Sequence, residues 1–266
     1  MEESRSERII AVLRAIVRGR RSWKLFVHWA FGRVGHRDFR AFIILTRARS
    51  GSNLLSSYLN SHPNIRADGE IFESLQGRRH VDILRKTFAR QPFYVRAKGF
   101  KLFYDHPYDG DGGALWRDLE SFGGLRVIHL KRDNILHTLV SYKLAAQTND
   151  WIRLQKHRST QRGKSVMSVS FTPEELASGF EQTRIWQRSA DERFPKTSVL
   201  TVTYEDLVAD RDATFRRICA FLKVAYRPPK TYLLKQNRQT MRQTVSNYDE
   251  LKSAFAATEW ASFFDE

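Results

Sequence analysis

The amino-acid sequence predicts an α/β fold, with a parallel β-sheet flanked by helices. Short apolar runs alternate along the chain with segments of helical periodicity, and several of the runs end in basic or polar turns. Strands that alternate with helices favour right-handed crossover units, which build parallel sheets. Ligands bind such sheets beyond the carboxyl ends of the strands. The residues that follow Leu45, Leu130 and Val202 are therefore expected to be the most informative.

Four apolar runs are interpreted as buried strands. They are residues 41–45, 93–103 (one strand or two), 125–130 and 197–202. Six further segments carry apolar residues at helical spacing and are predicted to be helices, at residues 53–60, 79–89, 113–121, 133–145, 174–192 and 211–222. The stretch 146–170 is polar, basic and aperiodic, and we interpret it as a long loop over the site.

The net charge and the cysteine content indicate which partners and which cellular compartment to expect. The 266 residues include 45 Lys and Arg against 29 acidic residues, a net charge of +16. This excess favours a polyanionic partner, which leaves nucleic acid, an anionic membrane and a phosphorylated ligand open. Cys219 is the only cysteine, so an internal disulfide is excluded and a reducing, cytoplasmic compartment is favoured.

Residues 1–36 are interpreted as a basic, amphipathic helical segment that precedes the main domain, residues 37–266. Its apolar residues between Ile9 and Val17 fall within one helical arc, and a basic, aromatic stretch follows. Such a helix either packs on the core of the domain or lies at an anionic membrane surface, in peripheral contact with the lipid. Both interpretations stay open at this point.

The first strand ends in a loop of basic and small polar residues. After the run 41–45 come Thr46-Arg47-Ala48-Arg49-Ser50-Gly51-Ser52-Asn53, and a helical pattern follows. Gly51 lets the backbone approach a ligand closely, and Ser52 is predicted to cap the helix. Amide groups at a helix N-terminus bind phosphate or sulfate readily, and arginines add charge and forked donors. An ordinary capped helix with surface arginines explains this segment alone equally well.

The predicted strand 125–130 is also followed by a basic turn and a helical pattern. We call each such connection from a strand to the next helix a joint. Lys131 and Arg132 follow the run 125–130, and Ser141 lies on the polar side of the next helical pattern. An arginine at a strand end and a serine on the following helix can hold one phosphate between them. Two such joints in one parallel sheet open onto the same crevice, which favours an anion-binding site with two anionic groups.

These two motifs resemble those of sulfotransferases that use 3′-phosphoadenosine 5′-phosphosulfate (PAPS). The segment TRARSGSNLLSSYLNSHPNI resembles their 5′-phosphosulfate loop, and HLKRDNILHTLVSY resembles their 3′-phosphate motif. Residues 201–224 and 234–251 are similar to the C-terminal part of bacterial carbohydrate sulfotransferases, which act on trehalose-type and lipo-oligosaccharide acceptors. The resemblance covers roughly residues 40–260. It implies a P-loop-like α/β fold and PAPS as the donor.

The resemblance assigns donor-binding roles residue by residue. Arg49 matches the residue on the bridging and sulfuryl oxygens, and Arg132 with Ser141 matches the pair on the 3′-phosphate. The other candidate contacts to the nucleotide are Ser50, Gly51, Ser52 and Asn53, with looser matches at Arg47, Gln236, Asn237 and Arg238. Leu54 stands where many cytosolic relatives have a tryptophan that stacks on adenine, so the adenine platform is left unassigned.

Glu70, in the segment ADGEIF, is the predicted catalytic base. It resembles the glutamate that serves as base in bacterial trehalose-type sulfotransferases, and a carboxylate can accept the proton of a sugar hydroxyl. His106 is the alternative base, because many other sulfotransferases use a histidine on a loop after a strand. Lys101 lies between them in the chain and can aid the sulfuryl group. No His, Cys or acidic cluster has metal-ligand spacing, so no metal is expected.

Two other classes of function stay open on the sequence. A P-loop-like small-molecule kinase is disfavoured because no Lys-Ser/Thr pair follows Gly51. A basic module that binds nucleic acid or membrane would not need two anion sites at strand ends. The preferred function is transfer of a sulfuryl group from PAPS to a sugar or glycolipid acceptor. No specific nucleic acid is expected as a partner. Neither the acceptor nor the oligomeric state follows from the sequence, and a homodimer is among the alternatives.

Overall fold

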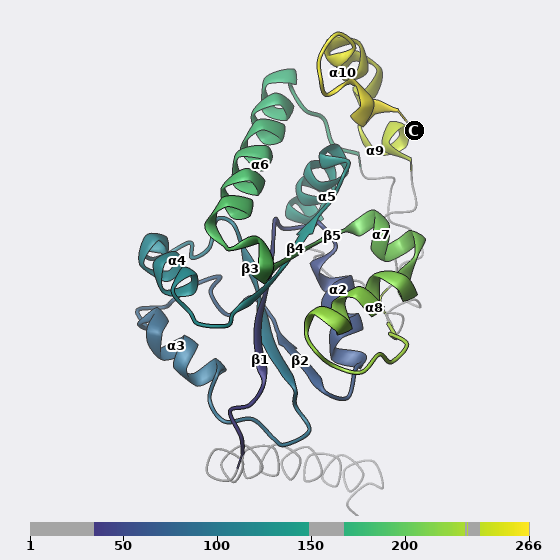
Figure 1. Cartoon of the computed structure of the whole chain (residues 1–266). Helices are drawn as coiled ribbons and strands as arrows, with labels where there is room; N and C mark the ends of the chain where they lie inside the picture. Colours follow the sequence, from purple (N-terminus) through teal and green to yellow (C-terminus); the bar gives the residue numbers. More distant parts are fainter. Residues whose placement is uncertain (1–34, 149–167, 232, 234–239, 266) are drawn as a thin grey trace, which may run out of the picture.

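The computed structural model describes residues 35–148, 168–231, 233 and 240–265. These residues form a sheet of five parallel strands in the order β2-β3-β1-β4-β5 (Figure 1). The strands are β1 (Arg40–Thr46), β2 (Ile65–Asp68), β3 (Ala97–Phe103), β4 (Arg126–Lys131) and β5 (Val199–Thr203). The predicted parallel α/β sheet is thus confirmed.

All six predicted helices are present, with shifted ends. The α-helices are α2 (Ser52–Ser61), α3 (His80–Thr87), α4 (Gly112–Glu120), α5 (Ile135–Thr148), α6 (Pro173–Arg193), α7 (Tyr204–Ala209), α8 (Arg211–Phe221), α9 (Met241–Thr244) and α10 (Tyr248–Phe255). Short 3₁₀ turns lie at η2 (Lys196–Ser198) and η3 (Ala261–Phe264). The predicted loop 146–170 was wrong at its start, because α5 continues to Thr148; its residues 149–167 lie outside the described residues.

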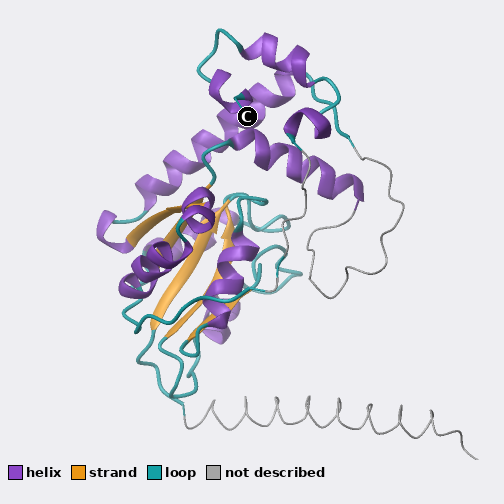
Figure 2. Cartoon of the chain, turned by 90° about the vertical axis from the view of Figure 1, so that its right-hand side faces the viewer, coloured by secondary structure: helices purple, strands orange, loops and turns teal. Residues whose placement is uncertain are grey.

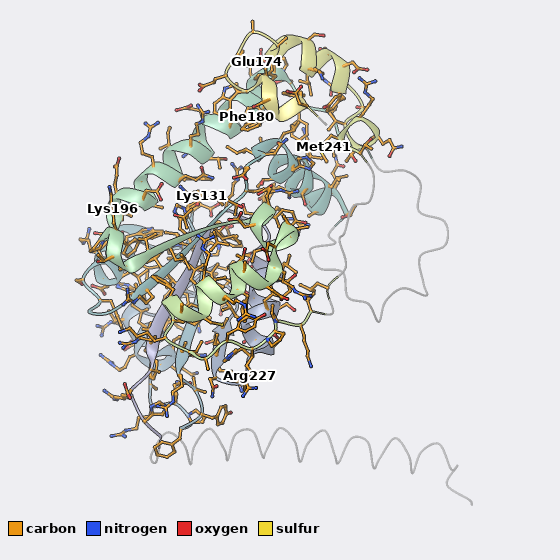
Figure 3. The ribbon with its side chains drawn as sticks, turned by 45° about the vertical axis from the view of Figure 1, so that its right-hand side comes forward. Lys131, Glu174, Phe180, Lys196, Arg227 and Met241 are labelled. Carbon is orange, nitrogen blue, oxygen red and sulfur yellow. The ribbon has the colours of Figure 1, made fainter. Side chains whose placement is uncertain are left out.

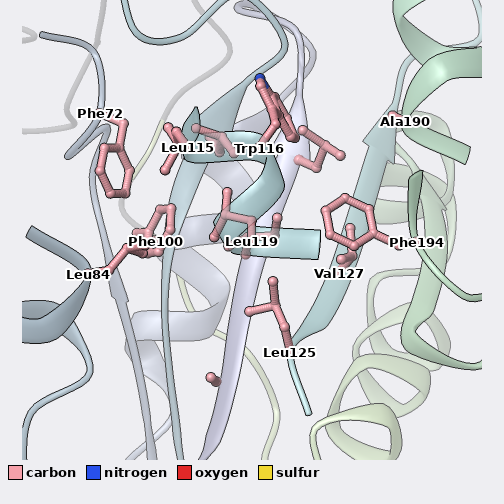
Figure 4. Close-up of a cluster of buried hydrophobic side chains, with 14 of the residues drawn as sticks. Phe72, Leu84, Phe100, Leu115, Trp116, Leu119, Leu125, Val127, Ala190 and Phe194 are labelled. Atoms are coloured by element: carbon pink, nitrogen blue, oxygen red, sulfur yellow. The ribbon is translucent and has the colours of Figure 1, made fainter. Parts of the chain in front are cut away.

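Helices cover both faces of the sheet (Figures 1 and 2). Helices α3, α4 and α6 lie on one face, over a core cluster that includes Phe72, Phe100 and Trp116 (Figure 4). Helices α2, α7 and α8 lie on the other face, over a second cluster that includes Phe42 and Phe215. A third cluster joins α5 and α6 to the C-terminal helices α9 and α10.

The central strand β1 is buried on both faces, as a strand inside a parallel sheet must be. Phe42, Ile43, Ile44 and Leu45 have no exposed surface. Because every strand runs the same way, the ends of β1, β4 and β5 lie at one edge of the sheet. At that edge the hydroxyl of Thr46 donates to the carbonyl of Leu130, 2.6 Å away, and joins the ends of β1 and β4.

Some predicted elements differ from the structure. Strand β2 was not predicted, and residues 93–96 do not belong to a strand, so the segment 93–103 holds one strand. Of the proposed N-terminal helical segment, residues 1–36, residues 1–34 lie outside the described residues. Within the described ranges, no helix has both the length and the apolar composition needed to cross a membrane.

Candidate active site

The joint between β1 and α2 turns sharply on two residues of positive φ. Arg49 has φ 71° and Gly51 has φ 94°. Gly51, and not Ser52 as predicted, is the N-cap of α2, and its carbonyl accepts from the amide of Leu55 at 3.1 Å. A side chain at Gly51 is excluded twice, because its φ is left-handed and a Cβ atom would lie 2.5 Å from the ring of Tyr204.

Arg49 and Arg132 bring the two predicted joints together. The Nε atom of Arg49 donates to the hydroxyl of Ser141 on α5, at 3.0 Å. The Nη1 atom of Arg132, beyond β4, donates to the carbonyl of Arg49 at 3.4 Å. A non-glycine residue in the left-handed region costs about 1 kcal/mol, and such strain collects at functional sites. The three residues that the sequence assigns to the two phosphate-bearing ends therefore lie in one cluster.

The surroundings of Arg132 suit it to bind an anion. Its guanidinium lies over the Tyr204 ring, 4.6 Å from the centroid, and its buried Nε makes no hydrogen bond within the described residues. The Nε atom is 3.9 Å from the Glu205 carboxylate, too far for a hydrogen bond. Burial lowers the pKa of Arg132, while Tyr204 and Glu205 oppose that shift. A buried cation with an unused donor fits a phosphate or sulfate oxygen.

The Glu70 carboxylate is tied to the first joint through Lys101. The Nζ atom of Lys101 lies 2.7 Å from Oε1 of Glu70 and 2.8 Å from Oδ1 of Asn53, in the first turn of α2. The amide of Lys101 donates to the carbonyl of Gly69 at 3.1 Å, which fastens the loop of Glu70 to β3. Lys101 is buried in the middle of the sheet, so both partners are held in place.

His106, the alternative base, lies close to Glu70 but is less accessible. His106 is 2% exposed, and its Nε2 atom is buried without a hydrogen-bond partner in the described part of the chain. Burial lowers the pKa of His106, the carboxylates of Asp105 and Glu70 act to raise it, and Lys101 acts to lower it. His106 is therefore neutral near pH 7.

Arg47 points away from the cluster. Its Nη1 atom donates to the carbonyl of Gly179 at 3.1 Å and to the hydroxyl of Thr183, both on α6. The guanidinium also lies 5.3 Å from the centroid of the Trp186 ring. We therefore leave Arg47 out of the proposed donor site. Gln236, Asn237 and Arg238 lie outside the described residues.

Two residues of the cluster were missed by the sequence analysis as parts of the site. Tyr204 and Glu205 begin α7, directly after β5, and Thr203 caps that helix. Tyr204 contacts Gly51 and Arg132, and Oε2 of Glu205 accepts from the amide of Asp133 at 3.1 Å. Their position after the strand that ends near Val202 was the signal, because that joint faces the same crevice as the other two.

Comparison with known proteins finds similarity to sulfotransferases. Residues 119–228, which include the second joint and the start of α7, match the model of the sulfotransferase family. Over these residues the chain is similar to sulfotransferases. "Nodulation protein H" of Rhizobium tropici is 29% identical over 242 residues, covering 84% of this chain and 92% of that protein. Its namesake from Rhizobium meliloti (strain 1021) is 24% identical over 246 residues, with 84% and 94% covered.

A solved sulfotransferase from Alicyclobacillus acidocaldarius is also similar, at 18% identity and a TM-score of 0.49. The match covers 81% of this chain and 90% of the chain in that structure. Sulfotransferases move a sulfuryl group from an anionic donor to an acceptor. The cluster at the carboxyl ends of β1, β4 and β5 is the part of the fold that can receive such an anion.

Proposed function

We propose that the enzyme transfers the sulfuryl group of PAPS to a hydroxyl group of a carbohydrate or glycolipid. PAPS carries a phosphosulfate at its 5′ end and a phosphate at its 3′ end. The observation that carries the proposal is the contact between the two joints, in which Arg49 hydrogen-bonds Ser141 while Arg132 hydrogen-bonds the carbonyl of Arg49. One site with two anion-binding loops fits a donor with two anionic ends.

The two ends of the donor are assigned to different joints. The amides at the N-terminus of α2, with Ser50, Gly51, Ser52 and Asn53, would bind the 5′ group together with Arg49. Arg132 and Ser141 would bind the 3′-phosphate. The guanidinium of Arg132 is buried, which makes its charge more effective than an exposed one.

Glu70 is the proposed base, and its exposure distinguishes it from His106. The side chain of Glu70 is 27% exposed, whereas that of His106 is almost fully buried, so an incoming hydroxyl group has better access to Glu70. In the proposed step, the acceptor oxygen forms a bond to sulfur while the bond from sulfur to the 5′-phosphate oxygen breaks. The hydroxyl proton passes to Glu70, and the bisphosphate leaves with its charge held by Arg49.

Lys101 is proposed to assist the same step by positioning Glu70 and supplying positive charge. Its ammonium group holds the carboxylate 2.7 Å away and contacts Asn53 in the proposed 5′ loop. It therefore fixes the distance between base and donor and places a positive charge where the transferring group becomes more negative.

The surroundings of Glu70 favour a sugar as the acceptor. Tyr108 is 57% exposed and Tyr142 is 44% exposed. Burial raises the pKa of Tyr108 to about 12, and Asp105, Tyr142, Glu73 and Glu70 add to that shift. Exposed aromatic rings beside carboxylates suit a pyranose, whose apolar face stacks on a ring while its hydroxyls donate to the acids.

Transfer of ³⁵S from labelled PAPS to a panel of sugars and glycolipids tests the function. We expect label in at least one carbohydrate acceptor, dependent on Glu70, and no transfer of phosphate from Mg-ATP. Transfer of phosphate from ATP, with no label moved from PAPS, would instead support a kinase.

A further inference from the structure

The amino-terminal edge of the sheet carries a surface that the proposed reaction does not use. We call residues 35–40, 62–66 and 88–97 the basal surface; it lies at the start of β1, β2 and β3, at the lower edge in Figure 1. Its three segments are joined by the amide of Arg96, which donates to the carbonyl of Asn64 at 2.8 Å, and by paired backbone bonds between His36 and Gln91. The basal surface is therefore one ordered unit.

Large aromatic side chains are exposed on this surface. Phe93 is 59% exposed and Tyr94 is 51% exposed, although both are bulky. The ring of Phe93 stacks on His36 with centroids 5.7 Å apart, and Arg66 lies 5.2 Å from the centroid of the Tyr94 ring. Adjacent exposed aromatic residues are costly in water, and they mark surfaces that bind a partner.

The basal surface is rich in positive charge. The basal surface holds five arginines and a single acidic residue, Asp38: the arginines are Arg37, Arg40, Arg66, Arg90 and Arg96. Arg96 reaches Asp38 only at 4.0 Å, so one carboxylate leaves most of this charge uncompensated. In Figure 3 side chains project downward from this edge of the molecule.

We propose that the basal surface docks onto an anionic lipid bilayer. Aromatic side chains settle at the boundary between headgroups and acyl chains, and arginines beside them pair with lipid phosphates. The adjoining sequence has the same chemistry: residues 8–33 hold seven basic residues, no acidic residue and an apolar arc. Both parts of the chain are thus suited to the same anionic, partly apolar partner.

Charge disfavours the other occupants of this surface. A second copy of the chain, packed symmetrically, would place five arginines against five arginines. Nucleic acid would match the charge, but the exposed aromatic rings of Phe93 and Tyr94 favour lipid.

Docking in this orientation would turn the active site toward water. Strand β1 has seven residues, and at about 3.3 Å per residue it separates the two edges of the sheet by roughly 20 Å. Glu70, Arg49 and Arg132 lie toward the carboxyl edge, so the acceptor hydroxyl would meet the enzyme on the side away from the bilayer. A membrane-linked acceptor would therefore have to extend about that distance from the bilayer surface to reach the active site.

Co-sedimentation of the full chain with vesicles tests the proposal. Vesicles of phosphatidylcholine are compared with vesicles that also contain phosphatidylglycerol. We expect binding to the anionic vesicles alone. The double variant Phe93→Ser/Tyr94→Ser should weaken it at least tenfold, and Arg37→Gln/Arg40→Gln should weaken it by about fivefold for each charge removed.

Matched controls keep the result interpretable. Arg188→Gln/Lys252→Gln removes two exposed cations from α6 and α10, outside the basal surface, and should bind as the wild type does. Each variant should keep the wild-type melting temperature and its response to adenosine 3′,5′-bisphosphate, which shows that the fold and the site are intact. Folded Phe93→Ser/Tyr94→Ser protein with wild-type vesicle binding would overturn the proposal. So would tighter binding to duplex DNA than to the anionic vesicles with the same dependence on Phe93.

Discussion

At the scale of single residues, Glu70 and His106 share a neighbourhood but differ in access. Both interact electrostatically with Lys101, yet only Glu70 has a substantial part of its side chain exposed. Glu70→Gln keeps the shape of the side chain and removes its ability to accept a proton. Turnover should fall by about two to four powers of ten, with little change in donor affinity, in a steady-state assay paired with calorimetry.

His106→Gln is the matched comparison. We expect a mild loss of turnover, because His106 contacts the rings of Phe103 and Tyr108 and only 2% of it is exposed. The roles of the two residues would be reversed by near-full turnover in Glu70→Gln together with an inactive His106→Gln that still binds donor.

The sequence indicates candidate residues for this site, but not the contacts between them. Arg49, Arg132 and Ser141 could be named because each has a set position relative to a strand end or a helix face. The contact of Lys101 with both Glu70 and Asn53 could not, because it depends on the side-by-side placement of β1 and β3 and on the loop after β2. For Arg47, too, the distance from the strand end says nothing about the α6 groups that it contacts.

At the scale of elements, a buried polar network joins α6 to the sheet. The Nδ1 atom of His129 in β4 lies 2.8 Å from the Asp191 carboxylate on α6, and its Nε2 atom lies 2.7 Å from the hydroxyl of Tyr104. Lys131 pairs with the other oxygen of Asp191 at 2.7 Å, at the end of β4 (Figure 3). Burial, with a smaller effect of Lys131, lowers the pKa of His129 to about 4.

This network predicts a loss of stability in mild acid. The pKa of His129 is lower in the folded chain than the ordinary 6.5, so the unfolded chain binds more protons between about pH 6.5 and 4. The contribution of His129 is therefore complete above pH 6.5 and falls by up to ~3 kcal/mol as the pH drops toward 4. His129→Gln should show a flatter decline of unfolding free energy over this range; an unchanged slope would contradict the assignment.

The contact between β1 and β3 predicts a position where no side chain is tolerated. A Cβ atom at Gly99 would lie 2.2 Å from the carbonyl oxygen of Phe42 in the neighbouring strand. Gly99→Ala should cost more than about 3 kcal/mol in chemical denaturation, because backbone must move to admit the methyl group. Gly123→Ala is the control, since nothing lies within 4 Å of its Cβ position. A Gly99→Ala protein as stable as this control would contradict the strand contact.

Periodicity explains which elements the sequence could predict. The central strands β1 and β4 are continuous apolar runs, and the six predicted helices repeat apolar residues every three or four positions. Strand β2 has four residues, Ile-Arg-Ala-Asp, with two of them charged, and it pairs only with β3 at the edge of the sheet. Because an edge strand needs little apolar surface, such a segment gives no distinctive pattern.

At the scale of the whole molecule, Cys219 reports on global unfolding. It is the only cysteine, it lies on the buried face of α8, and burial raises the pKa of its thiol to about 11. Thiolate is the reactive form, so a thiol reagent such as Ellman's should react very slowly with native protein at neutral pH and with one equivalent after denaturation. Rapid labelling of the native chain would mean that α8 opens locally, apart from global unfolding.

The central claim is that two joints of one sheet bind the two anionic ends of one nucleotide. Calorimetric titration with adenosine 3′,5′-bisphosphate and with AMP, on wild type and Arg132→Ala, tests it most directly. We predict that the wild type binds the bisphosphate far more tightly than AMP, and that Arg132→Ala loses most of this difference while its weak affinity for AMP hardly changes. Equal losses for both nucleotides, or wild-type protein that does not distinguish them, would contradict the claim.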